Sequence, residues 1–491
     1  MDAEAVMLAI GADASPASGA GHVMRCVALA EAWIATGGAV TFVSHRLPVR
    51  LAGRIADLGA ALVEREAELG AIARTASEVG ADWNVLDSYQ ATVADHEAAR
   101  ASGARLLVID DHGHAGRYAA DVVLDQNLDA DPAVYAGRAP GARLLLGSRY
   151  ALIRREFQGL RRPPGGTGTV EKVFVSLGGA PAPETMRLVL AGILAALPEG
   201  AGVVVAPGVT GGPEEVWAGD GRVTVADPGA GLAALMAGAD LAVTAAGSTV
   251  WELAFLGVPS ILVTTAANQR PLATRLAAHG AGLDLGWDHD LDPATVSDAV
   301  AAVVSDAARR ASMVRAGQDL VDGNGADRVV VTLRQATMHL EDATVADAEI
   351  LWEWANDPAT RASSFSSEPI PWSDHRSWFD QRLGDPGTHI YLAHDRSGLV
   401  GQIRFQVTGE VAEVSVNVAP RRRGHRLGSA LVAAGTARLF GEHPVGVVEA
   451  LIKAENIASI RAFTLAGYEP VGRSVERGPE VLRFTRHRDD G

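Results

Sequence analysis

The first part of the chain alternates short apolar segments with longer amphipathic ones. Apolar runs at residues 5–11, 38–44, 83–87 and 105–110 are separated by alanine-rich stretches with helical spacing. Uninterrupted short apolar runs are typical of strands buried on both faces, and their alternation with helices indicates parallel βαβ units. We therefore expect a Rossmann-like lobe over residues 1–157.

A second series of the same kind follows a linker. After Phe157 the segment QGLRRPPGGTGTVEK is first basic and then rich in proline and glycine, without an apolar period. Five further apolar runs predict strands, at residues 172–179, 201–208, 222–227, 240–247 and 260–265. Two α/β lobes in tandem, the second over residues 158–335, predict a cleft between the lobes.

The pattern changes near Gln335. Residues 341–383 hold four of the nine tryptophans and have a helix–loop–helix pattern. Three apolar runs joined by turns then predict consecutive strands, at residues 388–395, 398–407 and 410–420. An amphipathic helix follows Gly428. We expect a third domain, of the α+β class, over residues 336–491.

Composition narrows the class of protein. The 491 residues carry 43 Lys and Arg against 59 Asp and Glu, and this net charge of −16 argues against a protein that coats nucleic acid or an anionic membrane. Anionic ligands must be met locally, by glycine-rich turns and helix N-termini. The single cysteine, Cys26, cannot form an internal disulfide, and the sequence has neither a signal-peptide pattern nor an apolar run of membrane-spanning length. We expect a cytoplasmic enzyme without nucleic-acid or membrane partners.

One glycine-rich turn lies in the first lobe. Residues 18–30, SGAGHVMRCVALA, follow the first strand and open a helix. Gly19 and Gly21 let the backbone approach a ligand, and the turn directs His22 over the carboxyl edge of the sheet. A tight turn with His22 as an ordinary helix-start residue explains the segment equally well.

A second turn, in the second lobe, is more informative. A strand ends at Gly247, a helix begins at the pair Ser248-Thr249, and Glu252 lies one turn inside it. This order suits a pyrophosphate on the helix N-terminus and a ribose diol on the carboxylate. An N-cap serine and a first-turn acid explain each residue singly, but not the pair Asn268-Gln269 after the next strand.

These motifs, in this order, resemble nucleotide-sugar enzymes of the GT-B fold. The pattern GxSTxxELxxxGxPxI, followed by NQ, resembles the donor-binding half of GT-B glycosyltransferases, particularly the UDP-N-acetylglucosamine transferase that makes lipid II. The resemblance narrows to the UDP-2,4-diacetamido-2,4,6-trideoxy-β-L-altropyranose hydrolases of pseudaminic acid synthesis. It extends over residues 5–335 and rests on GAGHVMRCVALA at 19–30, DSY at 87–89, DQN at 125–127 and LGSRYALIRREF at 146–157.

The resemblance implies an inverting, metal-independent hydrolysis with UDP as leaving group and His22 as general base. Because a pyrophosphate leaves as a weakly basic anion, the site needs a base near neutral pH rather than a proton donor. Tyr89 would help to orient water or sugar. Contacts to substrate or UDP are implied for Gly19, Gly21, Arg25, Gly247, Ser248, Thr249, Glu252, Asn268 and Gln269. The run DDHGH at 110–114 lacks metal-ligand spacing and is interpreted as a polar turn.

The third domain carries its own motifs. Residues 414–432, VSVNVAPRRRGHRLGSALV, run from a strand into a basic turn and a helix, which suits the pyrophosphate of coenzyme A or a merely solvated loop. Residues 455–472, ENIASIRAFTLAGYEPVG, resemble the closing helix and strand of GNAT N-acetyltransferases. With NDPATR at 356–361 and HRSWF at 375–379, the order is similar to GNAT enzymes that acetylate the 4-amino group of a nucleotide-linked amino sugar.

The GNAT resemblance implies acetyl-CoA as co-substrate. Glu413 is the candidate base, against the alternative of an ordinary exposed strand carboxylate. Phe463 stands where the family often has an acid tyrosine, and Arg426 where it usually has a second glycine. Contacts to acetyl-CoA are implied for Val418, Arg423, Gly424, Arg426, Gly428, Ser429, Asn456 and Ser459.

The expected architecture is two Rossmann-like lobes in a GT-B arrangement followed by an α+β GNAT acetyltransferase domain. The two resemblances imply consecutive reactions on a UDP-linked amino sugar, first acetylation and then release of UDP, and one chain raises the local concentration of the intermediate. Two alternatives stay open: a GT-B glycosyltransferase with a UDP-sugar donor, and a nucleotide-sugar binding module that regulates the acetyltransferase.

Overall fold

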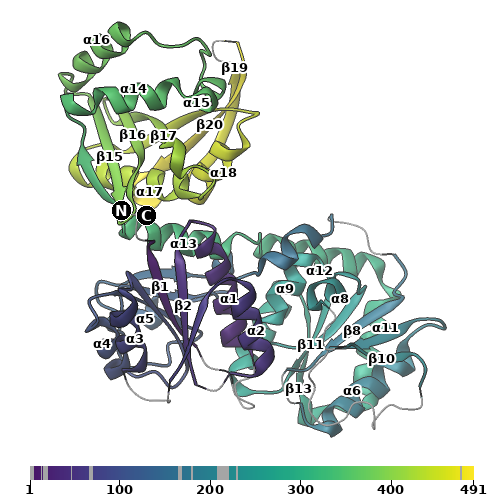
Figure 1. Ribbon diagram of the computed structural model, residues 1–491. Helices are drawn as coiled ribbons and strands as arrows, with labels where there is room; N and C mark the ends of the chain where they lie inside the picture. The colour runs from purple at the N-terminus through teal and green to yellow at the C-terminus, as the bar shows by residue number, and fades with distance from the viewer. Residues whose placement is uncertain are drawn as a thin grey trace. The chain divides into compact units, whose positions relative to one another are not determined.

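Three β-sheets follow one another along the chain in the computed structural model (Figure 1). The structure describes residues 5–12, 14, 20–45, 47–65, 70–163, 168–178, 181–206, 220–227, 231–475 and 478–490. Its two compact units comprise Leu8–Glu31 with Val40–Ala326, and Met1–Met7 with Ala32–Ala39 and Asp327–Gly491. No helix in the described part of the chain is both long and apolar enough to cross a membrane.

The first sheet has seven strands in the order β3-β2-β1-β4-β5-β6-β7. They are β1 (Met7–Ala12), β2 (Ala39–Ser44), β3 (Ala61–Glu64), β4 (Trp83–Asp87), β5 (Arg105–Asp110), β6 (Val122–Asp125) and β7 (Arg143–Leu146). The helices are α1 (Gly21–Ile34), α2 (Val49–Asp57), α3 (Ala71–Val79), α4 (Val93–Arg100) and α5 (Pro132–Tyr135). The order reverses at β1, which pairs in parallel with β4, and α/β sheets bind ligands at such a reversal.

The second sheet has six strands with parallel pairing, in the order β10-β9-β8-β11-β12-β13. They are β8 (Lys172–Ser176), β9 (Gly202–Val205), β10 (Val223–Val225), β11 (Leu241–Ala245), β12 (Ser260–Thr264) and β13 (Leu283–Trp287). The helices are α6 (Pro183–Ala196), α8 (Leu232–Ala237), α9 (Thr249–Leu256), α10 (Arg270–Ala278), α11 (Pro293–Ser305) and α12 (Ala307–Leu320). These sheets confirm two Rossmann-like lobes.

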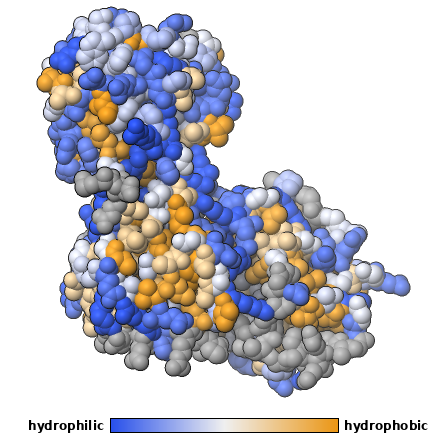
Figure 2. Space-filling model, viewed as in Figure 1, coloured by the Kyte–Doolittle hydropathy of each residue, from blue (hydrophilic) through white to orange (hydrophobic). Residues whose placement is uncertain are grey.

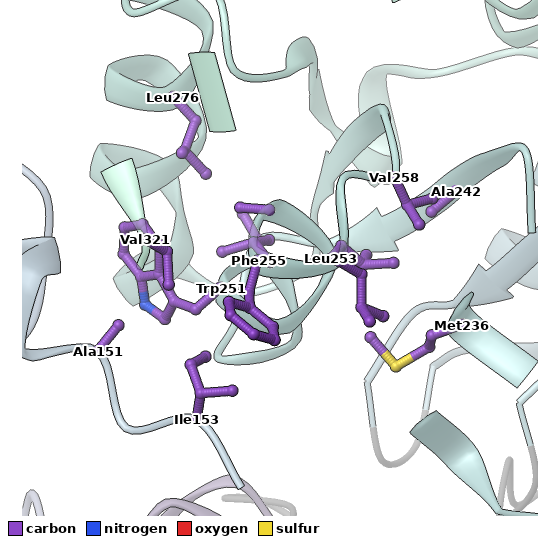
Figure 3. Packing of buried hydrophobic residues seen from close by; sticks show 14 of the residues in the cluster. Ala151, Ile153, Met236, Ala242, Trp251, Leu253, Phe255, Val258, Leu276 and Val321 are labelled. Atoms are coloured by element: carbon purple, nitrogen blue, oxygen red, sulfur yellow. The ribbon is translucent and has the colours of Figure 1, made fainter. Parts of the chain in front are cut away.

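Helix α9 lies in the middle of the second lobe's core. Six of its residues are buried, so the helix is apolar on nearly every side, as core helices are. Its Trp251 and Phe255 pack against Ala151 and Ile153, which belong to the segment that leads out of the first lobe (Figure 3). Glu252 is the single charged residue of this helix, and a charge in such surroundings requires a partner.

The third sheet is mixed and has the order β14-β15-β16-β17-β18-β20-β19. Its strands are β14 (His339–Asp342), β15 (Thr388–Asp395), β16 (Gly398–Thr408), β17 (Val411–Val418), β18 (Val447–Lys453), β19 (Glu469–Val475) and β20 (Glu480–His487). The helices are α13 (Gly325–Ala336), α14 (Ala348–Asn356), α15 (Pro358–Ser363), α16 (Trp372–Leu383), α17 (Leu427–Glu442) and α18 (Ile457–Leu465). The visible surface around this sheet is mainly hydrophilic, in keeping with an acidic protein (Figure 2).

Strands β17 and β18 run in parallel and then separate. Val411–Glu413 pair with Val447–Glu449, whereas β17 continues beside β16 to Val418 and β18 continues beside β20 to Lys453. Among the described residues, β17 and β18 therefore form no backbone ladder with each other beyond Glu413 and Glu449. Exposed strand edges of this kind accept an extended ligand through backbone hydrogen bonds.

A glycine sets the contact between two helices of the second lobe. A Cβ atom at Gly192 of α6 would lie 2.6 Å from the Cβ atom of Val296 and 2.7 Å from the carbonyl oxygen of Pro293. We expect Gly192→Ala to lower the free energy of unfolding by about 1–3 kcal/mol, although alanine favours helices. Gly53 of α2 has nothing within 4 Å of that position, so Gly53→Ala should raise stability by up to about 1 kcal/mol. Urea denaturation of both variants tests this, and equal effects would contradict the packing.

Candidate active sites

Three neighbouring strands of the first sheet each end in a buried aspartate. Asp87 ends β4, Asp110 ends β5 and Asp125 ends β6. They stand next to β1, after which the chain enters α1 at Gly21. The carboxyl edge beside the reversal of strand order is therefore lined with carboxylates, and it is where the sequence places His22. Gly19, also predicted here, lies outside the described residues.

His22 is held by the carboxylate of Asp87. Its Nδ1 lies 2.5 Å from Oδ1 of Asp87. Burial alone would raise the pKa of Asp87, but the guanidinium of Arg25 and the ring of His22 lower it well below its usual range. An ionised carboxylate only accepts hydrogen bonds, so Nδ1 carries the hydrogen and Nε2 of the neutral ring is the basic nitrogen. A histidine that accepts a proton at Nε2 requires this tautomer.

Arg25 is turned toward carboxylates. Its Nε and Nη2 each donate to Asp87 over 2.6 Å, and its Nη1 donates to Asp111 over 2.7 Å. Asp111 also accepts from the hydroxyl of Tyr89 and, over 3.2 Å, from Nδ2 of Asn127. In the structure the guanidinium of Arg25 is occupied by these two carboxylates, and its predicted contact with the substrate stays a prediction.

Tyr89 and Asn268 complete the group around His22. The Tyr89 ring lies edge-on to the His22 ring with centroids 4.6 Å apart. Burial and the carboxylate of Asp111 raise the pKa of Tyr89, which therefore remains a hydrogen-bond donor. Nδ2 of Asn268, from the turn after β12 in the other lobe, lies 3.5 Å from the Tyr89 hydroxyl. The structure thus brings these three predicted residues together from both lobes.

The turn before α9 faces the first lobe. A Cβ atom at Gly21 would lie 3.4 Å from Oγ of Ser248. Ser248 occupies the N-cap position of α9, but its side chain makes no capping hydrogen bond. The simple capping explanation for this serine therefore fails. Gly247 and Thr249 flank Ser248 in this turn, and both are half-buried. Their contact with a pyrophosphate stays a prediction.

Glu252 and Gln269 have partners within the protein. Oε1 of Glu252 accepts from Nε and Nη2 of Arg154 over 3.1 and 2.8 Å. Burial raises the pKa of Glu252, and Arg154 offsets part of that rise. Gln269 accepts from the backbone N–H and hydroxyl of Thr265, so it shapes its own turn. The predicted contacts of Glu252 and Gln269 with UDP remain predictions.

Sequence reasoning missed four residues of this site: Asp87, Asp111, Asn127 and Arg154. A signal for them was present. Asp87 and Asp111 stand at or just after the ends of buried strands, and polar residues there gather at one sheet edge. Arg154 is a cation inside an apolar segment, which requires a buried partner.

The DDHGH run forms a hydrogen-bonded turn. Asp110 accepts from Nδ1 of His114 over 2.6 Å, from the Tyr118 hydroxyl over 2.6 Å and from the backbone of Gly113 over 2.8 Å. Nε2 of His114 lies 3.3 Å from the carbonyl oxygen of Ala91. Both ring nitrogens of His114 face acceptor oxygens, which favours the protonated ring. The hydrogen bond to Asp110 is the largest cause of the raised pKa of His114. No cluster of three or more potential metal ligands is found in the part of the chain that the structure describes.

Asp125 shares a phenol with Asp110. The Tyr135 hydroxyl lies 2.9 Å from Oδ2 of Asp125 and 3.0 Å from Oδ2 of Asp110. One hydroxyl hydrogen cannot serve both oxygens, so one carboxyl must supply a second hydrogen. Burial raises the pKa of Asp125 to about 6, whereas hydrogen bonds from His114 and Tyr118 outweigh burial and lower that of Asp110. Asp125 is therefore the protonated partner in mildly acidic solution.

The second candidate site follows β17. Gly424 has φ +80° and Arg426 has φ +51°, so Arg426 adopts the left-handed conformation that the family's glycine favours. A Cβ atom at Gly428 would lie 3.6 Å from side-chain atoms of both Val418 and Ala462. The turn therefore keeps close backbone packing between β17 and α18, and Ser429 is buried behind it.

Three of the four arginines of this turn are paired with aspartates, and Arg421 has no ion pair with a described residue. Arg422 pairs with Asp395, Arg423 with Asp357 and Arg426 with Asp327. Arg423 also donates to the hydroxyl of Thr360 over 2.7 Å. In the structure the charges of Arg423 and Arg426 are paired with Asp357 and Asp327, and their predicted contacts with coenzyme A stay predictions. The exposed side chain of Arg421 and the backbone N–H groups at the start of α17 are donors available to an anion.

Glu413 stands where β17 and β18 separate, with an exposed side chain, beside Gln406 on β16 and Glu449 on β18. Asn456 caps α18 by accepting from the backbone of Ser459 over 3.1 Å. These positions agree with an acetyl-transfer site between the two strands, but they do not test it.

Tyr468, whose ring lies beside that of Phe463, does not take the place of the acid tyrosine. Phe463 is buried, with its ring 5.0 Å from that of Tyr468. The Tyr468 hydroxyl lies 2.7 Å from Oγ1 of Thr436, and burial raises its pKa. Tyr468 is therefore a poor proton donor.

Comparison with known proteins assigns families to two parts of the chain. Residues 337–469 match the acetyltransferase (GNAT) domain, and residues 223–328 match the glycosyltransferase family 28 C-terminal domain. The chain carries a GNAT acetyltransferase domain. Before it lie two Rossmann-like lobes, the second of which carries the glycosyltransferase family 28 match, as the sequence predicted.

Individual relatives each match part of the chain. The spore coat polysaccharide biosynthesis protein SpsG of Bacillus subtilis (strain 168) is 33% identical over 103 residues, which are 21% of this chain and 30% of that protein. Spermidine N-acetyltransferase from Vibrio cholerae, in complex with CoA and spermine, is 16% identical with a TM-score of 0.30, over 32% of this chain and 98% of that one. Aminoglycoside acetyltransferase AAC(6')-Ib, in complex with coenzyme A, is 20% identical with a TM-score of 0.29. The match covers 31% of this chain and 96% of that one.

The raised pKa of Asp125 predicts a pH-dependent stability. From about pH 4 the unfolded chain releases this proton while the folded chain keeps it to about pH 6, so folding loses stability as pH rises through this window. The Asp125→Asn variant cannot lose stability in this way. Its free energy of unfolding minus that of wild type should therefore be roughly 1–2 kcal/mol more favourable at pH 7.5 than at pH 4.5. Urea denaturation at both pH values measures it, with exposed Asp57→Asn as control. An equal difference at both pH values would exclude a protonated Asp125.

The left-handed conformation of Arg426 makes a second prediction. Arg426→Gly and Arg426→Ala both remove the ion pair with Asp327, so they differ mainly in the backbone cost at this position. We expect the glycine variant to be more stable by about 1 kcal/mol, because only glycine adopts positive φ without strain. Chemical denaturation compares the two. A more stable alanine variant would show that the turn has a different conformation in solution.

Proposed function

We propose that the chain is a bifunctional nucleotide-sugar enzyme of pseudaminic acid biosynthesis. Its GNAT domain acetylates the 4-amino group of UDP-4-amino-4,6-dideoxy-N-acetyl-β-L-altrosamine with acetyl-CoA. The two lobes then hydrolyse UDP-2,4-diacetamido-2,4,6-trideoxy-β-L-altropyranose to the free sugar and UDP. The observation that carries the hydrolase proposal is the His22–Asp87 pair, which meets Tyr89 and Asn268 at the reversal of strand order.

In the proposed hydrolysis, Nε2 of His22 removes a proton from water. The water oxygen forms a bond to the anomeric carbon on the face opposite UDP, the bond from that carbon to the phosphate oxygen breaks, and its electron pair leaves with UDP. Asp87 stabilises the resulting imidazolium, which later returns its proton to solvent. Tyr89 and Asn268 orient the water or the sugar.

UDP would lie across the start of α9. The backbone N–H groups there, with Ser248 and Thr249, suit its pyrophosphate, because a helix N-terminus offers unpaired donors and a positive dipole end. Glu252 would accept from the ribose hydroxyls while Arg154 holds its carboxylate in place. Arg25 acts on the substrate only through Asp87 and Asp111.

In the proposed acetyl transfer, Glu413 accepts the proton of the substrate ammonium, directly or through water. The amine nitrogen then attacks the thioester carbonyl, the carbon–sulfur bond breaks, the nitrogen releases its second proton to solvent, and the thiolate of coenzyme A takes a proton from solvent. A protein acid is not required, which agrees with Phe463 and with the tightly held hydroxyl of Tyr468. The GNAT fold and the turn that includes Gly424 and Gly428 support acetyl-CoA as co-substrate. A reducing, cytoplasmic location fits the buried free thiol of Cys26.

A glycosyltransferase is the second candidate function. The match of residues 223–328 to a glycosyltransferase family favours it, because transferases and hydrolases on this fold share the nucleotide half and differ in what attacks the sugar. Release of UDP without any acceptor separates the two.

An NMR time course tests the proposed function. We expect wild-type protein with UDP-4-amino-4,6-dideoxy-N-acetyl-β-L-altrosamine to form the diacetamido sugar and UDP only when acetyl-CoA is present. His22→Ala should stop at the acetylated UDP-sugar, and Asp87→Asn should slow UDP release by about 10²–10⁴-fold, because the base is lost or wrongly oriented. Acetylation should proceed at the wild-type rate in both variants, which controls for folding. Acetylation without UDP release in the wild type would contradict the hydrolase assignment.

A further inference from the structure

One face of the third sheet is polar. Gln402, Arg404 and Gln406 of β16 lie opposite Asn417, Ser415 and Glu413 of β17. The alternate residues, such as Ile403 and Val414, belong to the apolar core with α17, because successive side chains of a strand point to opposite faces. The polar row therefore points away from α17.

Helices α14 and α16 cover only part of this polar face. They pack on Ile390 and Leu392 of the neighbouring strand β15, where Leu351 and Phe379 bury the apolar side chains. Beyond them the β17 side chains of Glu413 and Ser415 are exposed. A charged surface is thus left open directly beside the candidate base.

Arg404 is the unusual residue of this surface. Its guanidinium lies over the ring of Trp378, 5.0 Å from the centroid, and makes no hydrogen bond or ion pair with any residue that the structure describes. Arg382 nearby donates to Gln406 over 2.6 Å, and the other paired arginines of the domain have carboxylate or carbonyl partners. Burial lowers the pKa of Arg404 and the charge of Arg382 lowers it further, whereas Glu413 opposes them.

A half-buried guanidinium that has a carboxylate nearby but no direct ion pair is incompletely compensated, and an anionic ligand at its edge would complete the pairing. The ring of Trp378 stabilises the flat face of the guanidinium but leaves its edge, which carries five N–H donors, available. Two of these donors match the oxygens of one phosphate. Arg404 is therefore built to receive a phosphate rather than to stabilise the fold.

We propose that Arg404 binds a phosphate of the nucleotide-linked amine acceptor while Glu413 faces the amine. This inference rests on the proposed function of the GNAT domain. Arg404 lies opposite Ser415, so Glu413 is its diagonal neighbour, with Cα atoms about 7–8 Å apart and side chains on one face. An acceptor that carries both a cationic amine and an anionic phosphate can span such a pair.

Coenzyme A is not the ligand of Arg404. Its pyrophosphate is expected at the turn after Val418 and at the start of α17, whereas Arg404 lies opposite the middle of β17 and on the face away from α17. The acceptor is the remaining anionic substrate of the reaction.

Steady-state kinetics with two acceptors test the inference. One acceptor is UDP-4-amino-4,6-dideoxy-N-acetyl-β-L-altrosamine, and the other is the same amino sugar without its nucleotide. We expect Arg404→Gln to raise KM for the UDP-linked acceptor at least 10-fold. Its KM for acetyl-CoA and its kcat/KM for the nucleotide-free acceptor should stay within 2-fold of wild type. Arg404→Lys should recover part of the loss, because it keeps the charge without the two parallel donors.

The matched control is Arg473→Gln on edge strand β19, which removes an arginine already paired with Glu480. It should leave all constants unchanged, and circular dichroism checks that each variant is folded. If wild type acetylates the UDP-linked acceptor and Arg404→Gln has an unchanged KM for it, the inference fails and the proposed function stands. A raised KM for acetyl-CoA alone would assign Arg404 to coenzyme A and also overturn it. If wild type acetylates neither acceptor, the proposed function fails, and the inference with it.

Discussion

The buried carboxylate of Asp87 is the group on which the first site depends. It has no exposed side-chain surface, and a charge in that position persists only when it is paired. Arg25 supplies the pairing with two parallel hydrogen bonds, and His22 supplies a third. If Arg25 were absent, burial would favour the protonated form of Asp87. That carboxyl group could then donate to Nδ1 of His22 and reverse the tautomer of the ring. Arg25 thus sets the ionisation of the carboxylate on which the proposed role of His22 depends.

The same constraint organises the rest of the molecule. Arg154 compensates Glu252 inside the apolar surroundings of α9, and each paired arginine of the GNAT turn has an aspartate from another element. Asp125 differs from these paired carboxylates. Burial raises its pKa, and no cation is among the causes that oppose this rise. Arg404 is set apart from all of these, since its guanidinium stacks on Trp378 and has no ion pair with a described residue, with Glu413 as its opposing charge nearby.

Prediction from the sequence succeeded where a pattern is local. The long apolar runs that became β1, β4, β5 and β11 carry their own evidence, because a strand buried on both faces needs nearly every residue to be apolar. Strands β3, β6 and β7, of four residues each, were missed, whereas β9, also of four residues, was found because it lies within the longer apolar run at 201–208. The glycine-rich turns were found for the same local reason, and so was His22.

The sequence by itself determined the order of lobes, the two ligand turns and the chemical types of residue near them, because these follow from apolar spacing and backbone freedom along the chain. Only the tertiary structure decided the partners of the charged groups. Arg25 reaches Asp87, Arg154 reaches Glu252 and Arg423 reaches Asp357 across 62 to 98 positions of sequence, and no local pattern encodes such distances. A guanidinium near a ligand turn has the same sequence signature whether it meets a substrate or a carboxylate. Folding makes that choice, because each buried charge must find its counter-charge among the elements that packing brings beside it.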